Sequence, residues 1–275
     1  MKSKIHEYNK NNSIVMSKKT ILITGASSGI GLEMAKILAS KNYNLILVAR
    51  NLDRLKSIKD DLESKYSSKV KIVRKDLSLS GNAEALYYEI KKEKLEVDYL
   101  INNAGIGNYG NFIETSLQEE LNMIELNIAS VVVLTKLFSQ DMVKKDSGNI
   151  MNIASLLSFL PFPYYSVYSA TKSFVLAFSE TVNAELEGTG VMVKALCPGP
   201  IDTGFTTTEM AATNAYKTNK PVLPEVVAQE GVKLLLNTKT KKIVGFTNWF
   251  ISNLPRVTPD FIMMKIKKNL ASQKK

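Results

Sequence analysis

The sequence predicts an α/β protein: a single doubly wound domain in which helices cover both faces of a seven-stranded, mainly parallel sheet. Short apolar, strand-like runs alternate along the chain with amphipathic helical stretches, as in sheets buried on both faces. The chain has 275 residues, of which 45% are apolar, and it contains no Gly/Ser-rich or Pro-rich linker. Such a chain is long enough to form one large core, so we expect no domain boundary.

The expected strands follow one another at the spacing of βαβ units. They are TILIT (20–24), LILVA (45–49), VKIVR (70–74), VDYLIN (97–102), NIMNIA (149–154), VMVKAL (191–196) and a shorter KIVGF (242–246). The segments between them are long enough for crossover helices. Because Met16, followed by SKKTILITG, would make an equally good start, we expect a flexible leader at 1–16. One domain then spans 17–275 and includes a substrate lid (about 200–222) and a basic C-terminal tail.

Residue counts exclude several kinds of active site. The chain has one histidine, His6 in the polar leader, and one cysteine, Cys197. A Ser-His-Asp triad, a Cys-His pair and the usual zinc sites are therefore not expected, and we predict no metal. Any acid or base must be Tyr, Lys, Asp or Glu. Cys197 is interpreted as a small buried residue in a reducing compartment.

The net charge of +10 is spread along the chain and includes only four arginines. Basic patches interleaved with aromatic residues are missing, so we expect no nucleic-acid partner. No run of 18 apolar residues and no secretion signal is found, which predicts a cytoplasmic protein without a membrane span. The basic tail, RVTPDFIMMKIKKNLASQKK, can be a membrane contact. A solvated helix packed on the domain is the favoured interpretation.

A glycine-rich turn follows the first expected strand. The strand runs into TGASSGIG and then into the helical stretch LEMAKILAS. Glycines permit a tight turn and close approach of a ligand, and a helix N-terminus favours anionic phosphate. The turn therefore predicts a dinucleotide site formed by Gly25, Ser27, Ser28, Gly29, Ile30 and Gly31, although a plain tight turn is the alternative.

The end of the second strand indicates which dinucleotide binds. An NAD site needs a carboxylate there to hold the ribose hydroxyls, but the residue is Ala49 and the next is Arg50. A guanidinium can bind a 2′-phosphate through charge-assisted hydrogen bonds. We therefore predict NADP(H), with NAD(H) less favoured. The alternative is that Arg50 only covers the following turn.

A tyrosine followed by a lysine four residues later is a candidate acid–base pair, but the pattern occurs four times: Tyr87/Lys91, Tyr88/Lys92, Tyr168/Lys172 and Tyr216/Lys220. The first two lie on a lysine-rich helix, where exposed pairs are expected, and the last has a loop-like context. Only Tyr168 follows a strand that ends in a serine, Ser155. Tyr164 and Tyr165 are interpreted as packing or pocket wall.

Three motifs occur in a familiar order: TGASSGIG, NNAG at 102–105, and Tyr168-Ser-Ala-Thr-Lys172. Together they resemble the classical short-chain dehydrogenase/reductase family, over about residues 18–250. The resemblance implies a Rossmann-like fold and hydride transfer between a nicotinamide and a carbonyl or alcohol. It also implies a catalytic set of Ser155, Tyr168, Lys172 and Asn127.

The chemistry of this set follows from its groups. A phenol with a pKa near 10 is a weak proton donor at neutral pH, and a nearby ammonium lowers that pKa. We therefore expect Lys172 to lower the pKa of Tyr168, and Ser155 to hydrogen-bond the substrate oxygen. By resemblance, Asn127 positions a water beside Lys172.

The resemblance implies further cofactor contacts. Asp76 and Leu77 flank the adenine, and Asn103, Ala104 and Gly105 support the adenosine side. Pro198, Gly199, Ile201 and Thr203 lie at the nicotinamide, which Tyr168 and Lys172 also contact. Members of the family pair through their long helices, so a homodimer or homotetramer is expected.

The expected substrate side is apolar. Leu156, Phe159, Leu160 and Phe162 follow the serine, and no arginine in these stretches can hold a carboxylate. We expect a lipophilic ketone or secondary alcohol, of steroid or acyl type, and hence a carbonyl reductase or alcohol dehydrogenase. The alternative is a non-catalytic NADPH sensor on the same fold. An intact Ser, Tyr and Lys set favours the enzyme.

Overall fold

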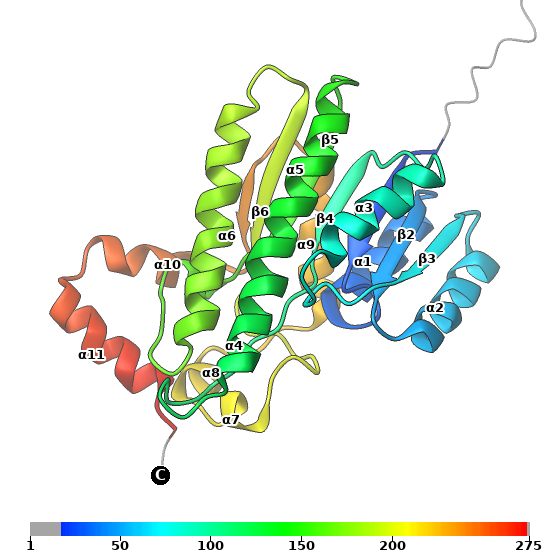
Figure 1. Ribbon diagram of the computed structural model, residues 1–275. Helices are drawn as coiled ribbons and strands as arrows, with labels where there is room; N and C mark the ends of the chain where they lie inside the picture. The colour runs from blue at the N-terminus through cyan, green and yellow to red at the C-terminus, as the bar shows by residue number, and fades with distance from the viewer. Residues whose placement is uncertain (1–17, 274–275) are drawn as a thin grey trace, which may run out of the picture.

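A computed structural model describes residues 18–273, so the expected leader and the residues at both chain ends lie outside the described part. All seven expected strands are present and form one sheet in the order β3-β2-β1-β4-β5-β6-β7 (Figure 1). Every neighbouring pair is parallel, so the sheet is fully rather than mainly parallel. The strands are β1 (Thr20–Thr24), β2 (Asn44–Ala49), β3 (Val70–Arg74), β4 (Tyr99–Asn102), β5 (Gly148–Ile153), β6 (Val191–Cys197) and β7 (Lys241–Ile243).

The seventh strand is shorter than expected. It was predicted to reach residue 246, but it ends at Ile243. Gly245 follows with φ at +92°, a conformation that strongly favours glycine. The chain turns there, and Phe246 begins helix α10 (Phe246–Asn253).

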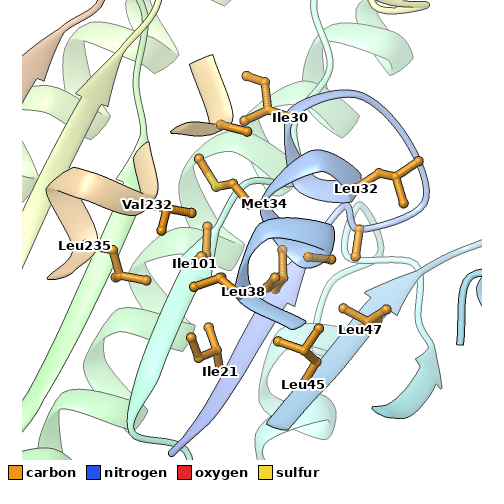
Figure 2. Close-up of a cluster of buried hydrophobic side chains, with 14 of the residues drawn as sticks. Ile21, Ile30, Leu32, Met34, Leu38, Leu45, Leu47, Ile101, Val232 and Leu235 are labelled. Atoms are coloured by element: carbon orange, nitrogen blue, oxygen red, sulfur yellow. The ribbon is translucent and has the colours of Figure 1, made fainter. Parts of the chain in front are cut away.

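One face of the sheet is covered by α1 (Gly29–Ser40), α2 (Leu52–Lys65) and α9 (Pro224–Leu236). Their apolar faces meet the strands in a single cluster, of which Figure 2 shows the centre. Met34 and Leu38 of α1 lie between Ile21 of β1 and Val232 of α9, all of them buried. This packing fixes the start of α1 against the carboxyl end of β1.

The other face is covered by α3 (Asn82–Lys92), α5 (Ser130–Val143) and α6 (Ser166–Glu185). Helix α4 (Leu117–Ile124), the π-turn η1 (Glu125–Ala129) and α5 form one continuous helix. This helix is long and apolar enough to cross a membrane by length and composition alone. Leu134, Phe138 and Met142 of α5 are buried in the core under the sheet. We therefore interpret it as a core helix.

The carboxyl ends of the strands carry the remaining elements. The lid contains α7 (Thr208–Ala211) and α8 (Asn214–Thr218). The last elements of the described residues are α10, η3 (Leu254–Arg256) and α11 (Asp260–Ala271). Helices α10 and α11 lie at the opposite side of the molecule from α2 and β3 (Figure 1). The basic tail packs on the domain through Met263 and Ala271, as expected, but its outer face is apolar as well as basic.

Candidate active site

A cavity of about 620 Å³ opens at the carboxyl ends of β1 and β4, where the strand order reverses. Ligands bind open parallel sheets at this switch point. All but two of the predicted site residues line it: Gly25, Ser27, Ser28, Gly29, Ile30, Arg50, Asp76, Leu77, Asn103, Ala104, Gly105, Ser155, Tyr168, Lys172, Pro198, Gly199, Ile201 and Thr203. The two exceptions are Gly31 and Asn127, which lie behind the wall.

The glycine turn is braced by Asn103. Its Nδ2 donates to the backbone oxygens of Thr24 and Gly25 at 3.0 and 3.1 Å. A Cβ on Gly31 would lie 2.5 Å from this Nδ2 and from the Gly25 oxygen, and Gly25 itself has φ at +65°. Gly31 therefore serves the packing of the turn rather than direct ligand contact, and Asn103 holds the turn in shape.

The N-terminus of α1 fits a phosphate group. Its N-cap, Ser28, makes no side-chain capping bond, and no acidic residue lies in the first turn. The first N–H groups of the helix therefore have no side-chain cap, and the helix dipole favours an anion there. Ser28, Gly29 and Ile30 line the cavity at this point. The residues present thus fit the pyrophosphate of a dinucleotide.

Basic groups collect where β2 and β3 end. Ala49 closes β2, and the exposed Arg50 lines the cavity beside Asp76. Burial acts to raise the pKa of Asp76, but hydrogen bonds from Ser78 and the charge of Arg50 lower it overall. Sequence reasoning missed Lys75, which also lines this end and pairs with Glu89 at 2.8 Å. Its position just after β3, at the carboxyl end of the sheet, is the sequence signal that could have identified it as a cavity residue.

Ser155, Tyr168 and Lys172 meet at the centre of the cavity. Ser155 follows β5 and caps the short helix η2 (Leu156–Ser158), and its Oγ accepts from Leu157 N at 3.1 Å. Tyr168 and Lys172 lie one turn apart on α6. Lys172 Nζ donates to the Ile153 oxygen at 2.8 Å, so the helix is bonded to the end of the strand that carries the serine.

The expected lowering of the pKa of Tyr168 is not found. Burial raises the pKa of Tyr168 to about 12, and only the neighbouring Ser155 hydroxyl acts to lower it. Burial also lowers the pKa of Lys172 to about 8. Lys172 Nζ lies 5.9 Å from the centroid of the Tyr168 ring. In the protein alone, the cost of burying a phenolate therefore sets the direction of the shift.

Asn127 lies in the π-turn η1, a helical irregularity that is frequent at functional sites. Its Nδ2 donates to the Ile106 oxygen at 2.9 Å and to Thr171 Oγ1 at 3.1 Å, and its Oδ1 accepts from Ile106 N at 3.1 Å. The side chain thus joins the loop after β4 to α6. The predicted role in a water relay stays a prediction.

The substrate side of the cavity is largely apolar. Leu156, Leu160 and Phe162 line it, as the sequence indicated, and so does Tyr165. The expectation was wrong for Phe159, whose ring lies outside this cavity with its centroid 5.7 Å from Lys241 Nζ. The rest of this wall includes residues of the predicted lid, as expected, and residues of the two C-terminal helices: Phe205, Met210, Thr213, Ala215, Ile251 and Leu270. No local pattern singles out these individual residues, because they reach the cavity only through tertiary packing.

Phe205 lies against the central tyrosine. The two ring centroids are 5.6 Å apart. Gly107 makes this contact possible, since a Cβ there would lie 2.8 Å from Phe205 Cζ and 3.0 Å from Tyr168 Cδ2. The lid therefore borders the reaction centre directly.

The other Tyr/Lys pairs have different surroundings. Tyr87 and Lys91 both donate to Asp141 Oδ2, at 3.0 and 2.9 Å, outside the cavity. Tyr216 was placed in a loop by the sequence, but it lies in α8 and lines the cavity. Cys197 is fully buried, and burial raises the pKa of its thiol to about 12.

The chain belongs to the short-chain dehydrogenase family. The family model described as "short chain dehydrogenase" matches residues 19–214, which include the glycine turn, the NNAG motif and the Ser, Tyr and Lys set. The fold, the glycine turn and the oxidoreductase class that the sequence predicts are those of this family.

Three similar proteins illustrate the relationship. The chain is 38% identical over 179 residues to a very-long-chain 3-oxoacyl-CoA reductase of Pyrenophora tritici-repentis, covering 64% of this chain and 52% of that relative. It is 32% identical to an NADP-dependent 3-hydroxy acid dehydrogenase of Schizosaccharomyces pombe, covering 82% of this chain and 89% of the relative. A Sphingobium yanoikuyae short-chain dehydrogenase in complex with NADPH superposes with a TM-score of 0.77 at 27% identity, covering 86% and 93% of the two chains.

These comparisons support NADP(H), the cofactor that the sequence predicts. They also show that the chain spans only about half the length of the first of these relatives. Substrate and partners therefore have to be argued from the cavity itself.

Proposed function

We propose that this protein uses NADPH to reduce a lipophilic ketone, of 3-oxoacyl or steroid type, to a secondary alcohol. The observation that carries the proposal is the position of Ser155, Tyr168 and Lys172. They stand where the polar, glycine-lined end of the cavity meets its apolar end. The names of two relatives, a 3-oxoacyl-CoA reductase and a 3-hydroxy acid dehydrogenase, favour a substrate oxygenated at the third carbon of an acyl chain.

The side chains divide the reaction between them. The reduced nicotinamide, when bound, supplies the hydride. Ser155 Oγ donates a hydrogen bond to the substrate carbonyl and orients it, and the Tyr168 hydroxyl gives its proton to the oxygen as negative charge develops. Lys172, charged at neutral pH with its pKa at about 8, stabilises the phenolate that remains.

The walls select for apolar substrates. The basic residues that line the cavity are Arg50, Lys75 and Lys172, and the first two lie at the adenosine end. Leu156, Leu160, Phe162 and Met210 surround the other end. A free carboxylate at the apolar end would have no cationic partner, which favours ketones, thioesters and steroids over short oxo acids.

The direct test is NADPH consumption with a panel of carbonyl compounds. Long-chain 3-oxoacyl thioesters, steroid ketones and aromatic ketones are compared with sugars and short oxo acids, and NADH is run in parallel. Turnover of a lipophilic class with NADPH supports the proposal. Turnover restricted to sugars or short acids contradicts it.

A Tyr168→Phe variant tests the catalytic assignment. Loss of the proton donor is expected to lower kcat by about 10²–10⁴ while NADPH binding is retained, because the ring still fills its place. Tyr165→Phe is the matched control, since Tyr165 lines the same cavity three residues earlier. Undiminished turnover by Tyr168→Phe would show that another group supplies the proton.

A further inference from the structure

The last two helices carry large apolar side chains on their outer face. We name residues 246–271, comprising α10, η3 and α11, the C-terminal arm. Its exposed large apolar residues are Phe246, Trp249, Phe250, Val257, Phe261, Ile262, Met264 and Ile266, among which Phe250 is 57% exposed and Phe261 68%. The rings of Phe246 and Trp249 stack with centroids 5.8 Å apart. Helical spacing (246, 249 and 250; 261 and 264) places each set on one face of its helix.

The opposite face of the arm packs against the rest of the domain and lines part of the cavity. Met263 and Ala271 of α11 are buried against the body, and Leu270 and Ile251 line the substrate end of the cavity. Tyr109 Oη donates to the Ala271 oxygen at 2.8 Å and so joins the arm to the loop after β4. The outer apolar side chains of the arm therefore do not contribute to the packed core of the domain.

The charges of the arm are nearly all positive. Residues 246–271 contain four basic side chains, Arg256, Lys265, Lys267 and Lys268, and one acidic side chain, Asp260. Within the described residues, none of the four basic groups forms an ion pair. The arm thus presents aromatic and aliphatic groups together with unneutralised positive charge.

A second exposed apolar surface has the opposite charge. Phe112 and Ile113, in the loop before α4, are 59% and 84% exposed. The charged residues beside them are Glu114 and, in the first turn of α4, Glu119. This second surface is smaller than that of the arm, and the charge beside it has the opposite sign.

We propose that the outer face of the C-terminal arm docks on a membrane surface that contains anionic lipids. Aromatic and aliphatic side chains flanked by lysine and arginine are the features of interfacial helices. Contact between two copies through this face would bring like charges together, whereas anionic headgroups neutralise them. Because Ile251 and Leu270 line the cavity from the opposite face of the same helices, the arm would separate the lipid from the substrate end of the cavity.

The test uses the only tryptophan of the chain, Trp249, which lies on this face. Its emission is recorded while the full-length protein is titrated with phosphatidylcholine vesicles or with vesicles that also contain phosphatidylglycerol. We expect a blue shift and co-sedimentation with the anionic vesicles. Apparent binding is expected to be at least about tenfold tighter than to phosphatidylcholine alone, and weaker at high salt. The readout needs no turnover, so it is independent of the proposed reaction.

Two double variants separate the contributions. Phe250→Ser with Phe261→Ser removes apolar area, and Lys265→Glu with Lys268→Glu reverses charge. Each is expected to weaken binding to anionic vesicles at least about tenfold. Phe112→Ser with Ile113→Ser is the control and is expected to leave binding unchanged. NADPH binding by each variant shows that the fold is intact.

Three results would overturn the inference. One is no shift of Trp249 emission and no sedimentation with anionic vesicles. Another is binding that the arm variants leave unchanged. The third is a change from dimer to monomer in light scattering for Phe250→Ser with Phe261→Ser, without lipid binding by the unmodified protein, which would assign the face to a subunit contact.

Discussion

Two buried lysines, Lys172 of α6 and Lys194 of β6, have similar burial and similarly lowered pKa values but different surroundings. Lys172 is 6% exposed and Lys194 is fully buried, and burial lowers the pKa of each to about 8. Lys172 lies in the cavity with one hydrogen-bond acceptor, the Ile153 oxygen. Lys194 Nζ donates to the oxygens of Leu234, Leu235 and Asn237 at the end of α9.

The difference lies in what surrounds the ammonium. Lys194 is saturated by carbonyl groups of a helix C-terminus, where a cation is stabilised by the dipole and by the last carbonyls. Lys172 has one carbonyl acceptor and lies 5.9 Å from the centroid of the Tyr168 ring in the cavity. Burial and a shifted pKa alone therefore do not mark a catalytic candidate; the open donor positions and the neighbouring cavity make Lys172 one.

Among the three basic residues compared, replacement of Lys172 is expected to have the largest effect on turnover. Lys172→Met is expected to lower kcat/KM by at least about 10², because the Tyr168 phenolate loses its nearby positive charge. Stability is expected to change little, since one hydrogen bond is lost and a buried charge is removed. Steady-state kinetics and denaturant unfolding measure the two effects. A large loss of stability with normal turnover would show that Lys172, like Lys194, has a structural role only.

A third basic residue, Arg50, differs from the two buried lysines because its side chain is exposed to solvent. Arg50→Ala is expected to weaken NADPH use relative to NADH by roughly 10- to 150-fold, which corresponds to about 1.5–3 kcal/mol for a lost charge-assisted hydrogen bond. The measurement is the ratio of kcat/KM for the two cofactors. Arg54→Ala, one turn further on, is the control. An unchanged ratio would leave Lys75 as the remaining basic group at this end of the cavity.

Removing the second lysine is expected to affect stability only. Lys194→Met leaves three carbonyls without this donor and should reduce the free energy of unfolding by about 1–3 kcal/mol. Turnover per folded molecule is expected to be unchanged. Urea unfolding followed by circular dichroism, with kinetics on the same samples, tests both. Equal or greater stability would show that the cost of burying the amine exceeds the value of its hydrogen bonds.

The smallest expected effect is a pH dependence of the difference in unfolding free energy between the parent protein and Lys194→Met. The pKa of Lys194 is about 8 in the folded protein and 10.5 when unperturbed. Between these values the unfolded chain binds more protons, so the free energy of unfolding rises with pH. Lys194→Met lacks this contribution. The stability difference between the parent and the variant should therefore grow in favour of the parent from about pH 8 to about pH 10. A constant difference would contradict the shifted pKa.

Several of these features were accessible from the sequence. The alternation of apolar runs and helical stretches predicted every strand to within a few residues, because strands buried on both faces leave a local pattern. The glycine turn and the Ser, Tyr and Lys set were found for the same reason: each motif is contiguous or keeps a short spacing. The end of β7 was missed because Gly245, read as part of a strand, turns the chain.

By itself, the sequence determined the fold class, the glycine turn and the Tyr168/Lys172 pair, since each leaves a local pattern, and the order of its motifs implied the remaining site residues through the family resemblance. Only the tertiary structure decided the rest. It brought Ile251 and Leu270 to the substrate wall, set Phe205 against Tyr168, and buried the phenol so that its pKa rises to about 12 instead of falling. These outcomes depend on desolvation and on contacts between distant segments, which no local pattern records.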